Sequence, residues 1–181
     1  MSLVSKGSDD RFEMNHEIDS CKDKETCPTI IKCSCLSSIT LPIGALVGDT
    51  FTLAALTLDT SCLCNPIIKL EFASNVVIPV SAAGAFSLRI FKQCRNQLAP
   101  IPVGPEWTFI SALIATDARV GSSTLSFFIC DDNSCSDECC VYTVVATVTR
   151  AVILGNININ NSTLGAIATC HSNKCRKNCT K

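Results

Sequence analysis

Hydrophobic and polar residues alternate in short runs along most of the chain from about residue 38 onward. In the run IIKLEF, for example, Ile68, Leu70 and Phe72 occupy one face while charged residues occupy the other. A period of two residues is typical of a β-strand with one buried face. On this basis strands are predicted over 50–60, 67–72, 76–80, 85–94, 106–115, 123–130 and 140–150, with one or two more between 156 and 170.

The segments between these runs have the composition of turns, because Gly, Pro, Asn, Asp and Ser dominate them. No stretch shows a helical repeat with recognisable caps. Short strands separated by such turns predict an all-β fold, an eight- to ten-stranded antiparallel jelly-roll-like sandwich. Pro79 indicates an edge strand or a bulge in the run over 76–80. The predicted turns are CNP at 64–66, SAAG at 81–84, APIPVGP at 99–105, DARVGSS at 117–123 and DDNSCSDE at 131–138.

The two ends of the chain differ from this body. Residues 1–27 are polar, charged and without periodicity, which predicts a flexible arm, and the C-terminal HSNKCRKNCTK is short and basic. We therefore expect an N-terminal arm or connector over 1–37, a sandwich domain over 38–170 and a tail over 171–181. The chain turns apolar at 28–43, and this stretch is either the first strand of its own sheet or a strand lent to a neighbour's open edge.

Charged residues are scarce in the body of the chain. They make up 17% of all residues, against roughly 25% in an average soluble domain, and 11 of the 31 fall between Lys6 and Glu25. Such a body is expected to bury much of its surface against copies of itself or against something else, although a monomer with a Thr- and Ser-rich exterior fits the composition too. The net charge of −1 gives no indication of a nucleic-acid or anionic-membrane partner.

The cysteine content and the N-terminus point to different compartments. The 14 cysteines indicate an oxidising environment, whereas the N-terminal MSLVSKGSDDRFEMNHEIDS has no apolar core of a signal peptide. No apolar run approaches the roughly 18 residues that span a bilayer, so no membrane insertion is expected. Oxidation after lysis of the producing cell reconciles the two observations, and thiolates that hold a metal in the cytoplasm are the alternative.

Residues suited to catalysis are few. The two histidines, His16 and His171, lie in the ends of the chain, where a catalytic pair would be poorly positioned. No GxSxG, P-loop, GxGxxG or HExxH motif occurs, and the carboxylates of the body are scattered. The sequence therefore predicts a protein that is not an enzyme, has no cofactor and has no evident small-molecule substrate.

The cysteine spacings favour disulfides over metal binding. CxxC, the spacing of redox motifs and of many zinc sites, does not occur. CxC occurs at Cys33/Cys35 and Cys62/Cys64. In an extended segment these two thiols point the same way with Cα atoms about 6.5–7 Å apart, so each pair is suited to partners elsewhere. The stretch DDNSCSDE also lacks the register of a calcium loop, and no metal site is predicted.

The stretch CDDNSCSDECC, residues 130–140, is predicted to form disulfide cross-links rather than a binding site. Cys139 and Cys140 project to opposite faces where a strand begins, so one can close an internal bridge while the other faces outward. We expect Cys130 and one of these two to staple this end of the sheet. Cys135, or the remaining cysteine of the pair, is then the thiol offered to a neighbouring chain.

Two ways of pairing the 14 cysteines remain open. All of them can bond within the chain, or those near its ends can bridge subunits, because an even count does not fix the connectivity. Bridging between subunits is favoured, since these cysteines lie on segments with little core of their own. They are Cys21, Cys27, Cys33, Cys35, Cys175 and Cys179.

Four strings of the sequence are similar to a known family: LTLDTSCLCNPIIKLEF (56–72), IFKQC (90–94), VGPEWTF (103–109) and FFICDDNSCSDECCVYTV (127–144). They resemble a small cysteine-rich domain of unknown function from clostridial spore formers, over about residues 40–150. More distantly, the layout of a cysteine-bearing arm followed by a jelly-roll body resembles the endospore appendage subunits of bacilli.

The resemblance to appendage subunits implies a mode of assembly. In those fibres jelly-roll subunits augment one another's sheets, and cysteines of the arm bond to later subunits. The resemblance implies that the cross-linking cysteines of the arm are Cys21, Cys27, Cys33 and Cys35. It implies that the acceptors lie among Cys62, Cys64, Cys94, Cys130 and Cys139/Cys140. The additional tail cysteines Cys170, Cys175 and Cys179 depart from the pattern and are expected to form tail disulfides.

These inferences combine into one predicted function. We expect a self-assembling structural subunit of an extracellular or spore-surface fibre, whose copies join into a helical polymer by strand augmentation and intermolecular disulfides. It would reach that surface without a signal peptide, by lysis of the mother cell. The alternatives are a non-polymeric, disulfide-stapled spore-coat or surface-binding module and, third, a thiolate metal-binding protein.

Overall fold

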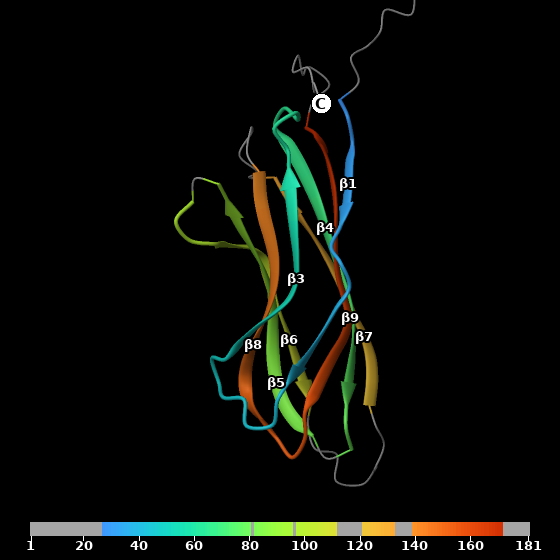
Figure 1. Ribbon diagram of the computed structural model, residues 1–181, viewed down its shortest axis with the longest axis vertical. Helices are drawn as coiled ribbons and strands as arrows, with labels where there is room; N and C mark the ends of the chain where they lie inside the picture. Colours follow the sequence, from blue (N-terminus) through green and yellow to red (C-terminus); the bar gives the residue numbers. More distant parts are fainter. Residues whose placement is uncertain (1–26, 81, 96, 112–120, 133–138, 172–181) are drawn as a thin grey trace, which may run out of the picture.

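The computed structural model describes residues 27–80, 82–95, 97–111, 121–132 and 139–171. These residues form nine β-strands and no helix, so the predicted all-β class is confirmed. The strands lie in two layers that run along the long axis of the molecule (Figure 1). They are β1 (Ile30–Cys33), β2 (Ser37–Leu41), β3 (Thr50–Asp59), β4 (Pro66–Ile78), β5 (Ala83–Cys94), β6 (Ile101–Ser111), β7 (Gly121–Asp131), β8 (Cys139–Ile153) and β9 (Ile157–Cys170).

The two sheets are antiparallel and exchange strands along the chain. The first sheet has the order β1-β9-β4-β7, with β2 also paired to β9, and the second has the order β3-β8-β5-β6. Among the connections from β2 to β9, only β5 to β6 stays within one sheet, and every other one crosses to the opposite layer. Eight strands distributed in this way make a jelly roll, the predicted sandwich.

The core lies between the inner faces of the two sheets. Leu70 and Phe72 of β4 are buried, as are Leu88 of β5 and Tyr142 and Val144 of β8. Their neighbours along each strand point to the outer faces, so the alternation in the sequence reports the two faces correctly. Burial of these apolar faces is the main force that holds the layers together.

Contacts between the sheets close the sandwich along both sides. On one side the Trp107 ring of β6 stacks on the Phe127 ring of β7, with ring centroids 3.9 Å apart. On the other side the Ser37 hydroxyl of β2 donates a hydrogen bond to the Leu53 carbonyl of β3. Each sheet edge is thus held against the opposite layer.

Residues 30–41 add β1 and β2 to the edge of their own sheet. Ile30 lies opposite Ala168 of β9, and strand pairing begins there, within the segment 1–37 expected as an arm. Ser34 bridges the gap between the two short strands, because its N–H donates to the Leu164 carbonyl and its hydroxyl accepts the Leu164 N–H. Of the two expectations for 28–43, the chain itself adopts the own-sheet pairing. Residues 1–26 lie outside the described residues.

The two strands predicted over 67–72 and 76–80 are one continuous strand, β4. The separation was wrong because Ser74 and Asn75 are polar, yet Ser74 is buried and the alternation continues through it. Pro79 follows the last residue of β4, which lies between β9 and β7. The expected edge strand or bulge at Pro79 is therefore wrong, and the proline ends a central strand instead.

The turn predicted over 99–105 is mostly strand. β6 begins at Ile101 and tolerates Pro102 and Pro105 because it is an edge strand, where some N–H groups need no ladder partner. Gly104 has a φ of +72°, and the pairing with β5 shifts register at this point. A Cβ at Gly104 would lie 2.9 Å from Ile129 Cγ2, so both backbone angle and space require glycine here.

Candidate functional site

The described residues include ten of the 14 cysteines, and they fall into bonded and unbonded groups. Disulfides join Cys27 to Cys170 and Cys94 to Cys140, and Cys64 is also disulfide-bonded. Cys62 lies half-buried in the turn between β3 and β4. The remaining predicted positions lie outside the described residues: Cys21, Cys135, Cys175 and Cys179.

The Cys27–Cys170 disulfide ties the start of the described chain to the end of β9. The two Cα atoms are 5.9 Å apart, and the bond spans 143 positions of sequence. A cross-link over so long a loop stabilises a fold by about 3–5 kcal/mol, because it restricts the conformations open to the unfolded chain. Cys27, which the resemblance assigns to cross-linking between subunits, is thus bonded within its own chain.

The Cys94–Cys140 disulfide joins neighbouring strands of the second sheet on its inner face. Cys94 of β5 and Cys140 of β8 are direct register partners, with Cα atoms 3.9 Å apart, and both are buried. The expected bridge from Cys130 to Cys139 or Cys140 is not formed. Cys130 is exposed on the outer face of the first sheet, whereas Cys140 points into the core from the second, so the two lie on opposite sides of a sheet.

Four cysteines form no disulfide in the described part of the chain. Cys33, Cys35 and Cys130 are exposed, and Cys139 is half-buried on the outer side of the second sheet. The adjacent Cys139 and Cys140 therefore face opposite ways, as neighbours in a strand must. The exposed thiols are chemically available for exchange with a disulfide or for oxidation with a thiol of another chain.

The outer face of the first sheet combines thiols with apolar side chains. Cys33, Gly165, Glu71 and Phe128 lie in register across β1, β9, β4 and β7, and line a groove of about 740 Å³. Phe128 is 63% exposed, which is high for an aromatic ring. The sequence signal for this surface is a phenylalanine on the polar phase of the strand over 123–130, and sequence reasoning gave it no role.

The strand edges differ in how well they are protected. β7 pairs with β4 over eleven consecutive positions without a bulge, and it contains no proline and no charged residue before Asp131. β6, the edge of the other sheet on the same side, carries Pro102, Pro105 and a register shift at Gly104. Prolines, charges and bulges prevent edge-to-edge pairing, so β7 is the less protected edge.

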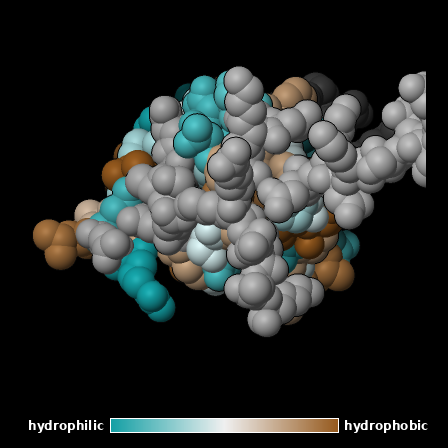
Figure 2. Space-filling model, turned by 90° about the horizontal axis from the view of Figure 1, so that it is seen from above, coloured by the Kyte–Doolittle hydropathy of each residue, from teal (hydrophilic) through white to brown (hydrophobic). Residues whose placement is uncertain are grey.

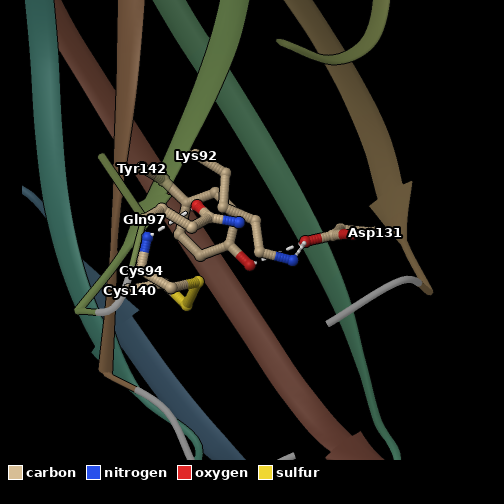
Figure 3. A network of polar contacts seen from close by, with 6 residues as sticks. All are labelled: Lys92, Cys94, Gln97, Asp131, Cys140 and Tyr142. Carbon is tan, nitrogen blue, oxygen red and sulfur yellow. Dashed lines mark hydrogen bonds and ion pairs between the residues drawn. A yellow bond between two sulfur atoms is a disulfide. The ribbon is translucent and has the colours of Figure 1, made fainter. Parts of the chain in front are cut away.

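A buried polar cluster lies at the end of the sandwich that also holds the Cys94–Cys140 disulfide (Figure 3). The Lys92 ammonium donates to Asp131 Oδ2 at 2.9 Å, and the Tyr142 hydroxyl donates to the same oxygen at 2.7 Å. The Cys94 N–H donates to Gln97 Oε1 at 2.9 Å beside them. Sequence reasoning missed this cluster, although Lys92 and Asp131 both occupy the apolar phase of their strands.

One carboxyl group has a clearly shifted pKa. The Ser61 N–H donates to Asp59 Oδ1 at 3.0 Å in the turn after β3, and this bond lowers the pKa of Asp59 below its ordinary value of 3.8. The Ser61 hydroxyl and the positive charges of Lys32 and Arg95 act in the same direction, while partial burial opposes them. Asp59 is a local turn-stabilising anion.

Three further observations on the described residues concern metal ions, histidines and membranes. No group of three His, Cys, Asp or Glu side chains there is placed to hold a metal ion. His171 is exposed after β9, and His16 is not described. None of the same residues forms a helix that is long and apolar enough to cross a bilayer. Seen down the long axis, hydrophilic and hydrophobic residues both reach the surface of the end where β1 begins and β9 ends (Figure 2).

Comparison with solved structures gives distant similarities of fold. A structure of the infectious bursal disease virus Gx strain is 12% identical, with a TM-score of 0.41, over 82% of this chain and 34% of the viral chain. This chain therefore spans about a third of that relative. Eiger TNF from S. frugiperda is 7% identical, with a TM-score of 0.37, over 85% of this chain and 98% of that one.

A structure of carbohydrate-binding modules from the β-sandwich superfamily is 10% identical, with a TM-score of 0.31, over 74% of this chain and 55% of that one. Similarities this weak say nothing of what the present chain binds.

No curated protein matches the chain. A family model does match residues 27–169, which cover all nine strands but for the last residue of β9. The chain therefore belongs to the family described as Domain of unknown function (DUF4489).

Proposed function

We propose that this protein is a structural subunit that assembles with copies of itself into an extracellular or spore-surface fibre, and that it is not an enzyme. Copies would join by pairing of sheet edges and would then be locked by disulfides between chains. The observation that carries this proposal is the β7 edge, a regular and nearly uncharged strand with the exposed thiol of Cys130 at its end.

The β7 edge supports pairing with another chain because it has no proline and no bulge, and its one charged residue, Asp131, is the last of the strand. Its residues from Gly121 to Cys130 are uncharged, and its pairing with β4 has no register shift. The β3 edge of the second sheet offers a second site, since Ala55–Asp59 follows its only bulge and contains no proline. Pairing of β7 with β3 of another copy is a head-to-tail contact, and such contacts produce open filaments unless the rotation closes a ring.

The exposed thiols support covalent locking of such a contact. Cys130 lies on the outer face of β7, and Cys33 lies two strands beyond β4 on the same face. Both are exposed in a chain that uses other cysteines for disulfides. An oxidised bond from either thiol to a neighbouring subunit would hold the polymer together in denaturant, and a thiol reductant would release it.

One observation favours a second candidate function. Residues 30–41 complete their own sheet, and the Cys27–Cys170 disulfide fastens them there, so this segment needs no second chain to be folded. This arrangement is that of a self-contained, disulfide-stapled surface module. The two candidates differ in whether the exposed thiols bond to other copies.

A denaturing gel with and without reductant, combined with negative-stain imaging of the same sample, separates the two candidates. The fibre proposal predicts a ladder of high-mass species without reductant, a single band with reductant, and filaments in the images. A single monomer band without reductant, in a sample that shows no filaments, would overturn it and favour the self-contained module.

A further inference from the structure

Lys92 and Asp131 form an ion pair that is almost completely shielded from water. Their side chains are 2% and 4% exposed, and the Lys92 ammonium lies 2.9 Å from Asp131 Oδ2. Lys92 belongs to β5 and Asp131 to β7, so the pair connects one sheet to the other through the core. Figure 3 shows both side chains reaching across the interior toward one another, with the Tyr142 hydroxyl at the same carboxylate.

Stability alone gives a weak reason for this pair. Removing two charges from water is costly, and a buried ion pair is often no more stabilising than apolar side chains of similar volume. The body of this chain is poor in charged residues, and the inner faces of β5 and β7 are otherwise largely apolar. An amine and a carboxyl group held together in a dry site are, however, the two reactants of an amide bond.

We propose that Lys92 and Asp131 condense to an intramolecular isopeptide bond that joins the two sheets covalently. A proton first passes from the ammonium to the carboxylate, which gives a neutral amine and a carboxylic acid. The amine lone pair then forms the Nζ–Cγ bond, one Cγ–O bond breaks, and the departing hydroxyl takes a second proton from the nitrogen. The products are one amide and one water molecule, so the step needs no oxidant, cofactor or other reactant.

The surroundings of the pair fit this reaction. The Tyr142 hydroxyl donates to Asp131 Oδ2 at 2.7 Å, where it can polarise the carboxyl group and protonate a departing oxygen. Tyr142 is the direct register partner of Lys92, and the Cys94–Cys140 disulfide joins the same two strands two positions further on. Reactants held this rigidly react as if at very high concentration. The apolar interior also favours the neutral amide over the charged pair.

The isopeptide bond would differ from the disulfides in its resistance to reductant. It would keep the two layers connected in the presence of reductant, because an amide is not reduced by thiols. The inference does not depend on the proposed fibre, since a single chain contains both reacting groups.

Intact-mass measurement of the full chain, unfolded and fully reduced, tests the proposal. The wild-type protein is expected to be lighter than its calculated mass by one water molecule. After trypsin, a branched peptide should join the Lys92 and Asp131 segments, with no cleavage at Lys92. A chain that has formed the Cys94–Cys140 disulfide, and is thus folded at this end, but retains its full calculated mass would overturn the proposal.

Three variants make the measurement specific. Lys92→Arg keeps a cation in place of the amine and should give the full calculated mass. Asp131→Asn should lose one ammonia instead of one water if the side chains condense. A mass deficit of one water that persists in Lys92→Arg would place the dehydration elsewhere and contradict the assignment.

Tyr142→Phe, the third variant, tests the role of the phenol as a positioning and proton-donating group. Bond formation in newly folded chain that does not yet contain the bond, followed as the growing fraction of dehydrated chain, should be on the order of a hundredfold slower. An unchanged rate in a variant that forms the Cys94–Cys140 disulfide would exclude that role for Tyr142.

Discussion

Single residues set the local geometry on which the sheets depend. Gly104 is the clearest case, because its positive φ lets β6 shift register against β5 and pass close to Ile129. Asp59 acts at a different point, where its carboxylate accepts the Ser61 N–H and turns the chain out of β3. Each residue makes a specific contribution to stability that a substitution can measure.

Gly104→Ala is expected to lower the free energy of unfolding by about 1–3 kcal/mol, because alanine is strained at this φ and its Cβ would press on Ile129. Chemical denaturation of the monomer, with its free thiols blocked, measures the change. Gly121→Ala is the matched control, since the nearest atom to an added Cβ there is 4.0 Å away and its φ is not positive. Equal losses in the two variants would contradict this assignment.

Asp59 should make stability depend on acid pH. A carboxyl group whose pKa is lowered by folding contributes stability above its ordinary value of 3.8, and this contribution is lost as the pH falls through the lowered value. The stability difference between the wild type and Asp59→Asn is therefore expected to be present at neutral pH and to shrink in acid. Denaturation curves across this range check it, and a difference that grows toward low pH would have the wrong sign.

At the scale of the strand, edge strands differ in the prolines, bulges and charges that prevent them from pairing with another chain. β6 has two prolines and a bulge, whereas β7 has neither and is almost uncharged. The alternation of the sequence predicts both as strands, but it does not say which strands become edges. That property depends on the order of strands in the sheets, and this order is set by the whole chain.

Thr124→Lys on β7 should weaken assembly, because an exposed lysine on an edge strand opposes pairing with another chain. Thr108→Lys on β6 is the matched control, since it also replaces an exposed threonine on an edge strand. The fraction of chain that sediments as polymer is expected to fall several-fold in the first variant and to change little in the second. If both variants assemble as the wild type does, β7 is not the edge that pairs.

The sequence is informative about strands and less so about their partners. Ile68, Leu70 and Phe72 identify a buried face by alternation alone, yet Ser74 hides the fact that β4 continues beyond it. Prolines at 102 and 105 indicate a turn locally, and only the edge position of β6 makes them compatible with a strand. Local patterns thus locate elements well where tertiary context does not override them.

The disulfide pairing is harder to predict from the sequence than the strands are. Cys94 bonds to Cys140 because β5 and β8 become neighbours, although the residues are 46 positions apart in sequence. Cys130 is closer to Cys140 along the chain but lies in the other sheet. The buried ion pair, by contrast, could have been predicted from the sequence, because Lys92 and Asp131 occupy positions at which the alternation predicts apolar residues.

At the scale of the whole molecule, two disulfides and the buried ion pair lie toward one end of the sandwich. These are the Cys27–Cys170 and Cys94–Cys140 disulfides and the Lys92–Asp131 pair, at the end of the sandwich where β1 begins and β9 ends (Figure 1). No described cysteine lies at the opposite end, around the turns at 42–49 and 154–156. We therefore expect the cysteine-bearing end to be the last part of the fold to open.

Cys27→Ser is expected to destabilise the monomer by about 3–5 kcal/mol, because it removes the longest loop closure in the described chain. It should also release β1 from β9, which hydrogen exchange over Ile30–Cys33 would detect as lost protection. Cys33→Ser removes an exposed thiol instead and should change stability by no more than about 0.5 kcal/mol. Equal protection of β1 in both variants would show that the disulfide does not hold it.

The most direct test of assembly through the exposed thiols is an isotope-mixing experiment. Equal amounts of heavy- and light-nitrogen chains are mixed while reduced, allowed to assemble and oxidise, and digested without reduction for mass spectrometry. Peptides containing Cys33, Cys35 or Cys130 should be found in mixed heavy–light disulfides, whereas Cys94–Cys140 peptides should be only heavy–heavy or light–light. If every disulfide joins peptides of the same label, the copies are not cross-linked, and this result would contradict the proposal that disulfides between chains hold the fibre together.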